Sequence, residues 1–351
     1  MKIQNKVLAY IIEHSLVKKG DRVLLAFSGG PDSVCLFHLL RVWQTRLKFG
    51  LFAGHFDHGL RPFSENDSVF CKELSAKYRV PFLAGKGSLK PGAAEDASRK
   101  ARYDFLKKTA DHFSCHSIAT GHQLDDQAET IILHLIRGTG LQGLSGITPY
   151  RPVSSGSKIN LIRPLLSVSR VEISGFLAEK DYRFVSDATN LDQKFQRNRI
   201  RLELLPLLAE YNPNIKGALF RMAEILNADY QYISGQAADF LKSRCLFNNV
   251  GVAFMRPASG SMNRAPTNAA EGYKIPRREF LSLPISLQRE ILRQALSGLM
   301  DTSYRVDYEE VEYLRRFFIS GRQQKLRISN NLQASKLKEY FVLSSNFASA
   351  Q

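Results

Sequence analysis

The segment Ser28-Gly29-Gly30-Pro31-Asp32-Ser33 combines residue types that suit a phosphate-binding loop. Glycines let the backbone approach an anion closely, and amides at a helix start point towards it. Ser28 and Ser33 add hydroxyl donors, and the Asp32 carboxylate suits Mg²⁺ held against phosphate. The spacing is neither that of a Walker loop nor that of a G-x-S-x-G nucleophile elbow. An ordinary strand–helix turn is the alternative, but packing alone explains these residue types poorly.

A second polar segment, His55-Phe56-Asp57-His58-Gly59-Leu60-Arg61, lies at the end of an apolar run. Two histidines and an aspartate invite a zinc interpretation, but the segment offers no third close His or Cys ligand. Polar side chains where a strand meets its loop are better explained by a nucleotide and its phosphates. We therefore expect this segment, including Phe56, His58 and Arg61, to face the nucleotide. For His55, a packing role is equally compatible with the sequence.

A third segment, residues 121–130, carries three acidic side chains: Asp125, Asp126 and Glu129. Asp126 and Glu129 are three residues apart, so they share one side of a helix. A carboxylate in the first turn of a helix can simply match the helix dipole, which accounts for Asp125 but poorly for Glu129. The three acids together suit an ammonium group or a metal ion.

Arginines are concentrated in residues 197–201, where Arg197, Arg199 and Arg201 flank Asn198. Exposed arginines are usually solvated, and that is the default interpretation. The guanidinium group also forks onto phosphate oxygens, so contact with an RNA backbone is the stronger interpretation here.

The elements that must position these segments alternate between strand and helix. Apolar runs predict strands at 23–27, 51–56, 80–84, 117–120 and 160–163. Repeated strand–helix units indicate an α/β fold, with a Rossmann-like parallel sheet that binds ligands beyond the carboxyl ends of its strands. The Asn-Pro-Asn sequence at 212–214 predicts a boundary between a catalytic domain, 1–214, and a mostly helical domain, 215–351. A terminal β-hairpin is expected from 325–328 and 336–343.

The composition limits the class of protein and of partner. The 351 residues include 49 Lys+Arg and 33 Asp+Glu, a formal net charge of +16, which suits either solubility or a polyanionic partner. Long apolar runs are missing and charges interrupt the first 27 residues, so we expect a cytoplasmic protein without a membrane span. The four cysteines are isolated in sequence, which argues against a disulfide framework or a cysteine-held iron–sulfur cluster.

Taken together, the segments resemble the N-type ATP pyrophosphatase, or PP-loop, superfamily, whose members carry an S-G-G-x-D-S loop. Their order is similar to that of the tRNA(Ile)-lysidine synthetase family. The resemblance is strong over residues 20–215, and residues 287–293 and 311–343 look like the second, tRNA-binding domain of that family. The matching segments are 28–33, 55–61, 95–103, 121–130, 137–146, 163–166 and 187–201.

The resemblance implies an ATP-dependent, Mg²⁺-requiring ligase that acts on the isoleucine tRNA with a CAU anticodon. The C2 oxygen of the wobble cytidine, position 34, would attack the α-phosphate of ATP, giving an adenylated cytidine and pyrophosphate. The ε-amine of L-lysine would then displace AMP to form lysidine, which changes codon specificity from AUG to AUA. A homodimer is compatible with the sequence.

The resemblance also implies roles for individual residues. Residues 28–33 would bind ATP, with Mg²⁺ at Asp32, and Asp126 and Glu129 would hold the substrate lysine. The positive charge near the leaving phosphate would come from His58, Arg102 and Arg137. The arginines at 197–201 would meet the tRNA. Two alternatives remain: a PP-loop enzyme of the 2-thiocytidine synthetase type, which the isolated cysteines disfavour, and a non-catalytic tRNA-binding protein.

Overall fold

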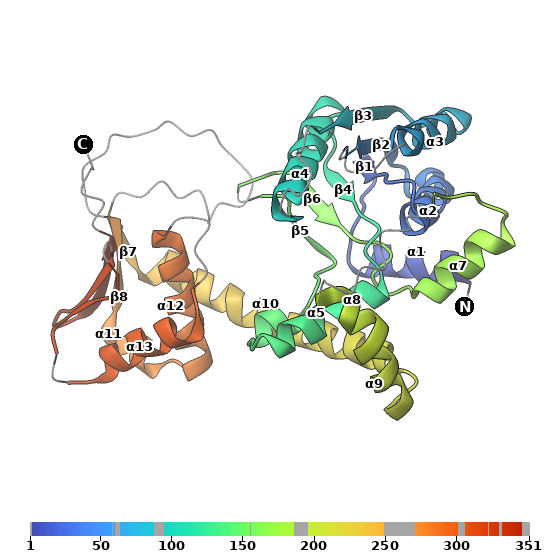
Figure 1. Ribbon diagram of the computed structural model, residues 1–351. Helices are drawn as coiled ribbons and strands as arrows, with labels where there is room; N and C mark the ends of the chain where they lie inside the picture. The colour runs from blue at the N-terminus through green and yellow to red at the C-terminus, as the bar shows by residue number, and fades with distance from the viewer. Residues whose placement is uncertain are drawn as a thin grey trace. The chain divides into compact units, whose positions relative to one another are not determined.

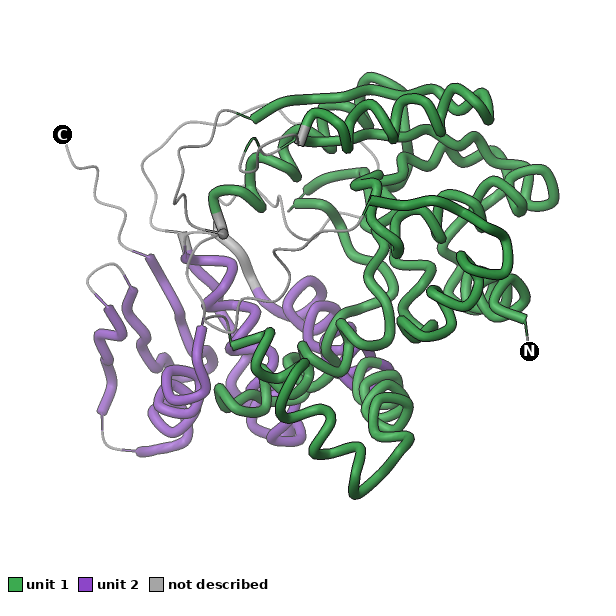
Figure 2. The backbone as a smooth tube through the Cα atoms, turned by 45° about the vertical axis from the view of Figure 1, so that its right-hand side comes forward, with its two compact units in different colours: residues 1–227 green, residues 228–351 purple. Residues whose placement is uncertain are grey.

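The fold is shown in Figure 1 as a computed structural model. The structure describes residues 2–57, 59, 64–87, 95–154, 156–185, 196–248, 271–300, 306–321, 323–329 and 332–345. The chain divides into two compact units, residues 1–227 and 228–351 (Figure 2). The dividing point falls inside helix α10 (Ile215–Arg244), downstream of the Asn-Pro-Asn sequence at which the sequence predicts the boundary.

The first unit is built on a six-stranded sheet with the strand order β3-β2-β1-β4-β6-β5. Neighbouring strands run parallel except the edge strand β5, which is antiparallel to β6. The expected α/β fold with a mostly parallel sheet is confirmed. The strand β5 was not predicted, because this short exposed strand contains a proline. The strands are β1 (Arg22–Ala26), β2 (Gly50–Asp57), β3 (Phe82–Lys86), β4 (Ser117–Ala119), β5 (Tyr150–Pro152) and β6 (Asn160–Ile162).

Helices cover both faces of this sheet (Figure 1). Successive side chains of β1 point to opposite faces, so Val23 and Leu25 pack in one core cluster while Leu24 packs in another. The first cluster includes side chains of α1, α2, α3 and α7, and the second includes those of α4. The helices of this unit are α1 (Ile3–Glu13), α2 (Pro31–Leu47), α3 (Ser64–Lys77), α4 (Glu95–His112), α5 (Leu124–Ile136), α6 (Leu141–Leu144), α7 (Arg170–Glu179), α8 (Gln196–Arg199), the π-helix η2 (Ile200–Leu204) and α9 (Leu205–Tyr211).

The second unit joins helices to a five-stranded antiparallel sheet with the order β7-β8-β11-β10-β9. Its core contains four phenylalanines, Phe280, Phe317, Phe318 and Phe341, of which Phe318 and Phe341 are stacked with ring centroids 4.3 Å apart. Besides the end of α10, its elements are α11 (Arg277–Ser282), α12 (Ile285–Leu299), α13 (Tyr308–Ile319), β7 (Leu246–Asn248), β8 (Glu271–Pro276), β9 (Lys325–Arg327), β10 (Leu332–Lys336) and β11 (Tyr340–Ser345).

The predicted terminal hairpin is corrected by this sheet. Residues 325–327 pair with β10, and β10 pairs in turn with β11, so the ending is a three-strand meander rather than one hairpin. The predicted second strand, 336–343, spans the turn between β10 and β11, because alternation alone does not fix where an apolar run reverses.

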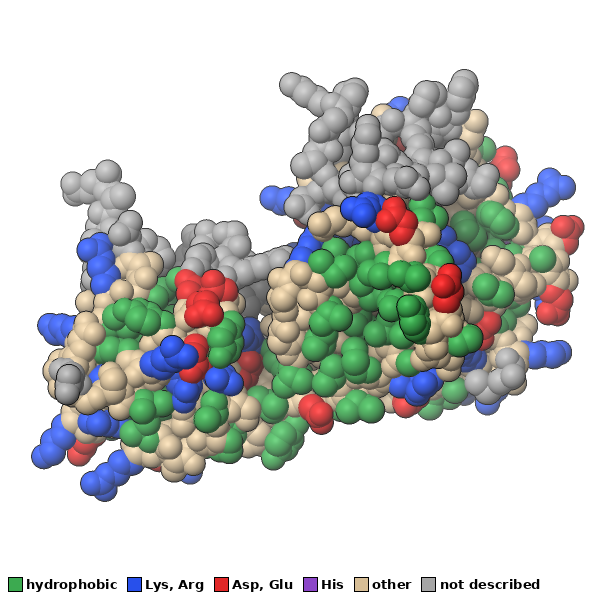
Figure 3. Space-filling model, turned by 60° about the horizontal axis from the view of Figure 1, so that its bottom comes forward, with side chains coloured by type: hydrophobic (Ala, Val, Ile, Leu, Met, Phe, Trp, Pro, Cys, Tyr) green, Lys and Arg blue, Asp and Glu red, His purple; other side chains and the backbone are tan. Residues whose placement is uncertain are grey.

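On the surface seen in Figure 3, basic side chains are scattered, some of them beside acidic ones, rather than gathered in one patch. No helix within the described part of the chain is both long enough and apolar enough to cross a membrane.

Candidate functional site

The loop between β1 and α2 has the geometry expected of a phosphate-binding turn. Gly30 caps α2 with an extended backbone, and Pro31 occupies the first turn, where its missing N–H costs nothing. The Ser28 hydroxyl donates to Ser33 Oγ at 3.1 Å, and the Ser33 hydroxyl donates to the Gly30 carbonyl at 2.9 Å. Gly29 has φ +84°, a conformation that side chains rarely adopt. The loop is therefore held in one shape, with the first-turn amides of α2 at its centre.

Asp32 points a buried carboxylate out of this loop. Its Oδ1 atom is buried and has no hydrogen-bond partner among the described residues. Burial, followed by the nearby carboxylate of Asp126, raises the pKa of Asp32 to about 6. A buried carboxylate with an unused oxygen and acidic neighbours is a suitable ligand for a cation.

Packing brings the third sequence segment onto the loop. A Cβ atom added at Gly121, just after β4, would lie 3.2 Å from both the carbonyl carbon and the Cβ of Asp32. Glycine therefore lets the β4–α5 junction approach the loop closely, since a larger residue would crowd Asp32. Gln123 then caps α5: its Oε1 accepts from the Asp125 amide at 2.6 Å, and Asp126 Oδ2 accepts from the Gln123 amide at 3.1 Å.

Asp125 has a structural role, as its position in the first turn suggests. One of its oxygens accepts from the Arg170 amide at 3.0 Å, and the other forms an ion pair with Lys216. These contacts lower the pKa of Asp125 against the effect of its burial. This carboxylate therefore ties α5 to α7 and to α10.

Glu129 is fully buried and is occupied by arginine. Arg201 Nε donates to Glu129 Oε1 at 2.6 Å and its Nη2 donates to Oε2 at 3.1 Å, while Arg197 Nε lies 3.5 Å from Oε2. Arg197 also donates to the Thr130 hydroxyl at 2.8 Å. The sequence predicts that Glu129 holds lysine and that these two arginines meet RNA; in the structure the three side chains contact one another. A carboxylate with 0% exposure needs a cationic partner, and the two arginines supply it.

Asp126 is less committed than Glu129. Its Oδ1 lies 3.8 Å from Arg201 Nη2, beyond hydrogen-bonding distance, although close enough for attraction. Burial raises its pKa, and the amide of Gln123 and the arginines only partly oppose the rise. Asp126 and Asp32 thus leave carboxylate oxygen available within one small region.

The second sequence segment reaches the same loop through His55. His55 Nδ1 is 2.9 Å from the Phe27 carbonyl, and burial lowers the pKa of this histidine, so the ring is neutral. Asp57 accepts from the Gly59 amide at 2.8 Å and shapes the turn. Phe56, predicted to bind nucleotide, packs its ring 5.4 Å from the ring of Phe105 on α4. His58 and Arg61 lie outside the described residues.

The remaining predicted basic residues are placed on three helices. Arg102 is half-buried on α4 and lies over the Tyr103 ring at 5.5 Å. Arg137 ends α5 and donates to Gln196 at 3.0 Å. Arg199 is 65% exposed and pairs with Glu203 at 3.4 Å, and Asn198, its half-buried neighbour on α8, has an interaction partner.

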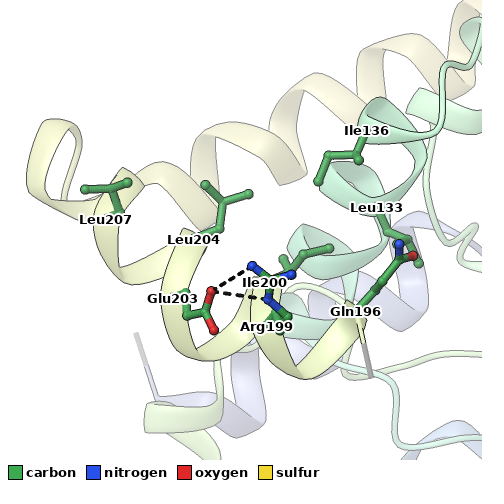
Figure 4. A pocket seen from close by; sticks show the side chains of 8 residues that line it. All are labelled: Leu133, Ile136, Gln196, Arg199, Ile200, Glu203, Leu204 and Leu207. Atoms are coloured by element: carbon green, nitrogen blue, oxygen red, sulfur yellow. Dashed lines mark hydrogen bonds and ion pairs between the residues drawn. The ribbon is translucent and has the colours of Figure 1, made fainter. Parts of the chain in front are cut away.

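Arg199 and Glu203 line a surface pocket of about 370 Å³ (Figure 4). The other lining side chains are mostly apolar and come from α5, η2 and α9: Leu133, Ile136, Ile200, Leu204 and Leu207, with Gln196 of α8. The catalytic residues predicted from sequence are not among those that line this pocket.

Sequence reasoning missed several residues of the site. Gly121, His122 and Gln123 lie in the segment 121–130, but the sequence predicts no individual role for them. Burial and four arginines, Arg163 foremost, lower the pKa of His122 to about 3, and its Nδ1 lies 2.8 Å from Thr120 Oγ1. Their position at the carboxyl end of a strand was the available signal. Within the described ranges, no three His, Cys, Asp or Glu side chains form a metal cage of their own.

Comparisons with known proteins show which family the chain resembles. A family model described as a PP-loop domain matches residues 1–208. The tRNA(Ile)-lysidine synthase of Nostoc sp. is 34% identical over 300 residues, which cover 85% of this chain and 84% of that protein. The enzyme of the same name from Dehalococcoides mccartyi is 39% identical over 232 residues, 64% of this chain and 49% of the relative. That from Geobacter sulfurreducens is 33% identical, and this chain spans 64% of its length.

Among solved structures, the U34-tRNA thiolase NcsA from Methanococcus maripaludis, with its [4Fe-4S] cluster, is similar with a TM-score of 0.54. The match covers 64% of this chain and 78% of the thiolase at 17% identity, and so it concerns the fold alone. The chain spans about half the length of the Dehalococcoides relative and most of the length of the Nostoc relative. From the loop geometry and these matches together, the chain belongs to the PP-loop proteins and, among them, to the tRNA(Ile)-lysidine synthase family.

Proposed function

We propose that this protein joins L-lysine to C2 of the wobble cytidine in the CAU-anticodon isoleucine tRNA, using ATP and releasing AMP and pyrophosphate. The observation that carries the proposal is the close packing of Gly121 on Asp32, which places the acidic start of α5 beside the phosphate-binding loop. A nucleotide phosphate and a cationic amine can therefore be bound next to each other.

The loop residues fit a nucleoside triphosphate with its magnesium ion. Ser28, Ser33 and the amides at the start of α2 offer donors to phosphate oxygens. Asp32, with its unpartnered Oδ1, is the residue that would hold Mg²⁺. Magnesium is usually bound by one or two carboxylates together with substrate phosphates, and it would neutralise the charge of the departing pyrophosphate.

The acidic start of α5 fits the second substrate. Asp126 is the carboxylate that we assign to the lysine ammonium, and Glu129 supports it indirectly by holding Arg201 in place. The amine must lose a proton before it attacks C2, because an ammonium group has no lone pair. A carboxylate whose pKa is raised by burial is a better proton acceptor than an exposed one, and this favours Asp126.

Positive charge for the phosphate groups is available from arginines near the β4–α5 junction. Arg102, together with Arg163 and Arg99, lowers the pKa of His122 electrostatically, so the three arginines are near this histidine. We assign Arg102 to the leaving phosphate. The target cytidine must leave the anticodon stack to reach this region, which single-stranded loops permit at modest cost.

The test is incubation of the protein with ATP, isotope-labelled lysine and a transcript of isoleucine tRNA with a CAU anticodon. Mass analysis of the digested nucleosides should show cytidine that has gained lysine and lost water. The matched control is the same transcript with uridine at position 34. Uracil lacks the 4-amino group of cytosine, so this transcript should remain unmodified. Pyrophosphate release without any lysine-bearing nucleoside would refute the assignment.

A further inference from the structure

Arg163 is a buried cation with no acidic partner among the described residues. It follows β6 directly and is only 4% exposed. One end of its guanidinium donates to the Thr148 carbonyl at 2.5 Å, while its Nε is buried without a hydrogen-bond partner in the described structure. A buried charge with an unused N–H donor costs free energy unless a ligand supplies a hydrogen-bond acceptor.

The groups around Arg163 increase this positive charge rather than neutralise it. Burial and the neighbouring Arg151 lower the pKa of Arg163 to about 10, and Arg99 adds to the effect. Arg99 and Arg102 both lie over the ring of Tyr103, at 5.1 and 5.5 Å from its centroid. The ring thus gathers two guanidinium groups, and both the ring and Arg99 are near enough to Arg163 to affect its pKa.

His122 lies within the field of the same arginines. Burial, followed by Arg163, Arg99 and Arg102, lowers the pKa of its imidazole. The contrast with Arg201 is informative, because that arginine meets the buried Glu129 in two hydrogen bonds. The same unit therefore pairs the half-buried Arg201 with a carboxylate and leaves the more deeply buried Arg163 without one among the described residues.

We propose that Arg163, with Arg99 and Arg102, forms a second anion-binding site that takes a phosphoryl group through the free Nε of Arg163. The existence of an anion site does not depend on the reaction proposed above. Its assignment to a phosphoryl group does rest on that proposed function, which supplies two sources: the α-phosphate of the nucleotide and a phosphodiester of the RNA. Guanidinium groups bind both through the same paired hydrogen bonds.

The first measurement uses inorganic phosphate as the probe and thermal unfolding as the readout, with potassium chloride at equal ionic strength as the reference. Phosphate at about 50 times its Kd should raise the Tm of the wild-type chain by about 5 °C. The variant Arg163→Met should lose this rise. Arg46→Met removes an exposed arginine from α2, away from this cluster of arginines, and should keep it.

A variant at Arg99 protects the test against failure of Arg163→Met to fold. Arg99 is exposed, so Arg99→Met should leave the fold intact while reducing the phosphate-dependent rise by at least half. Equal rises in wild type, Arg163→Met and Arg99→Met would overturn the proposal. If Arg163→Met does not fold, an undiminished rise in Arg99→Met has the same consequence.

A second measurement identifies the source of the phosphoryl group. If it belongs to the nucleotide, Arg163→Met should weaken binding of AMP by about 10- to 100-fold while leaving binding of adenosine unchanged. If it belongs to the RNA, the same loss should affect an anticodon stem-loop, and the preference for AMP over adenosine should persist. Unchanged affinity for both AMP and the stem-loop contradicts the proposal. Neither assay needs lysine or product, so a failure to form lysidine leaves this result independent.

Discussion

Asp32 is predicted to destabilise the fold when it is ionised. Its carboxylate is buried beside Asp126, and its pKa is raised from 3.8 to about 6. Each pKa unit corresponds to 1.36 kcal/mol, so ionisation of Asp32 costs the folded state up to about 3 kcal/mol. The variant Asp32→Asn removes this charge and keeps the shape of the side chain. We therefore expect the variant to be more stable than wild type by as much as about 3 kcal/mol at pH 8.

The sign of the pH dependence follows from the direction of the pKa change. Between about pH 6 and pH 4, the folded chain keeps a proton on Asp32 that the unfolded chain has released. The contribution of this group to stability therefore increases as the pH falls through that window. The advantage of Asp32→Asn should accordingly shrink from its full value at pH 8 to nearly nothing at pH 4.

Urea unfolding followed by tryptophan fluorescence measures the difference. Trp43 is the protein's single tryptophan, is 8% exposed and lies on the same helix as Asp32, so it reports on this unit. Asp104→Asn, which removes an exposed carboxylate from α4, is the matched control and should show no such pH-dependent gain. A variant at Asp32 that is less stable than wild type at pH 8, or a difference that stays constant from pH 8 to pH 5, would refute the reasoning.

Three other substitutions test the remaining contacts of the site. Gly29→Ala places a side chain at φ +84° and 3.2 Å from Cys71 Sγ, so urea unfolding should show a loss of about 1–2 kcal/mol. Glu129→Gln leaves Arg201 without its anion and should cost about 3 kcal/mol, a loss that should be smaller when Arg201 is already replaced by methionine. Asp126→Asn should raise the KM for lysine at least tenfold while changing the Kd for the tRNA less than twofold; equal use of lysine by the variant removes the assigned role.

The sequence allowed the phosphate-binding loop to be predicted because all its determinants are local. Gly29, Gly30 and Pro31 set the turn and start the helix within three residues, and β1 precedes them directly. The acidic side of α5 could be predicted for the same reason, since the spacing of Asp126 and Glu129 sets their common direction on a helix. Features of this kind can be predicted from neighbouring residues because the local backbone conformation determines them.

The partners of these residues could not be predicted, because they come from distant parts of the chain. Glu129 and Arg201 are 72 positions apart in the sequence. The phosphate-binding loop and Gly121 lie close together because β1 and β4 pair in the sheet. An arginine at a strand end, such as Arg163, looks the same in the sequence whether it is solvated or buried. The three arginines at 197–201 likewise looked alike, although the structure turns two towards Glu129 and leaves Arg199 at the surface.

Two kinds of charge lie close to the β4–α5 junction, and the proposed reaction needs both. Asp32 and Asp126 offer carboxylate oxygens, and Arg163 and its neighbours act electrostatically on His122, only four positions before Asp126. The first group suits a cationic amine and the second suits an anionic phosphate. The net charge of +16 is therefore less informative than its local division. A uniformly basic site would bind the tRNA and ATP but would repel the ammonium group that completes the reaction.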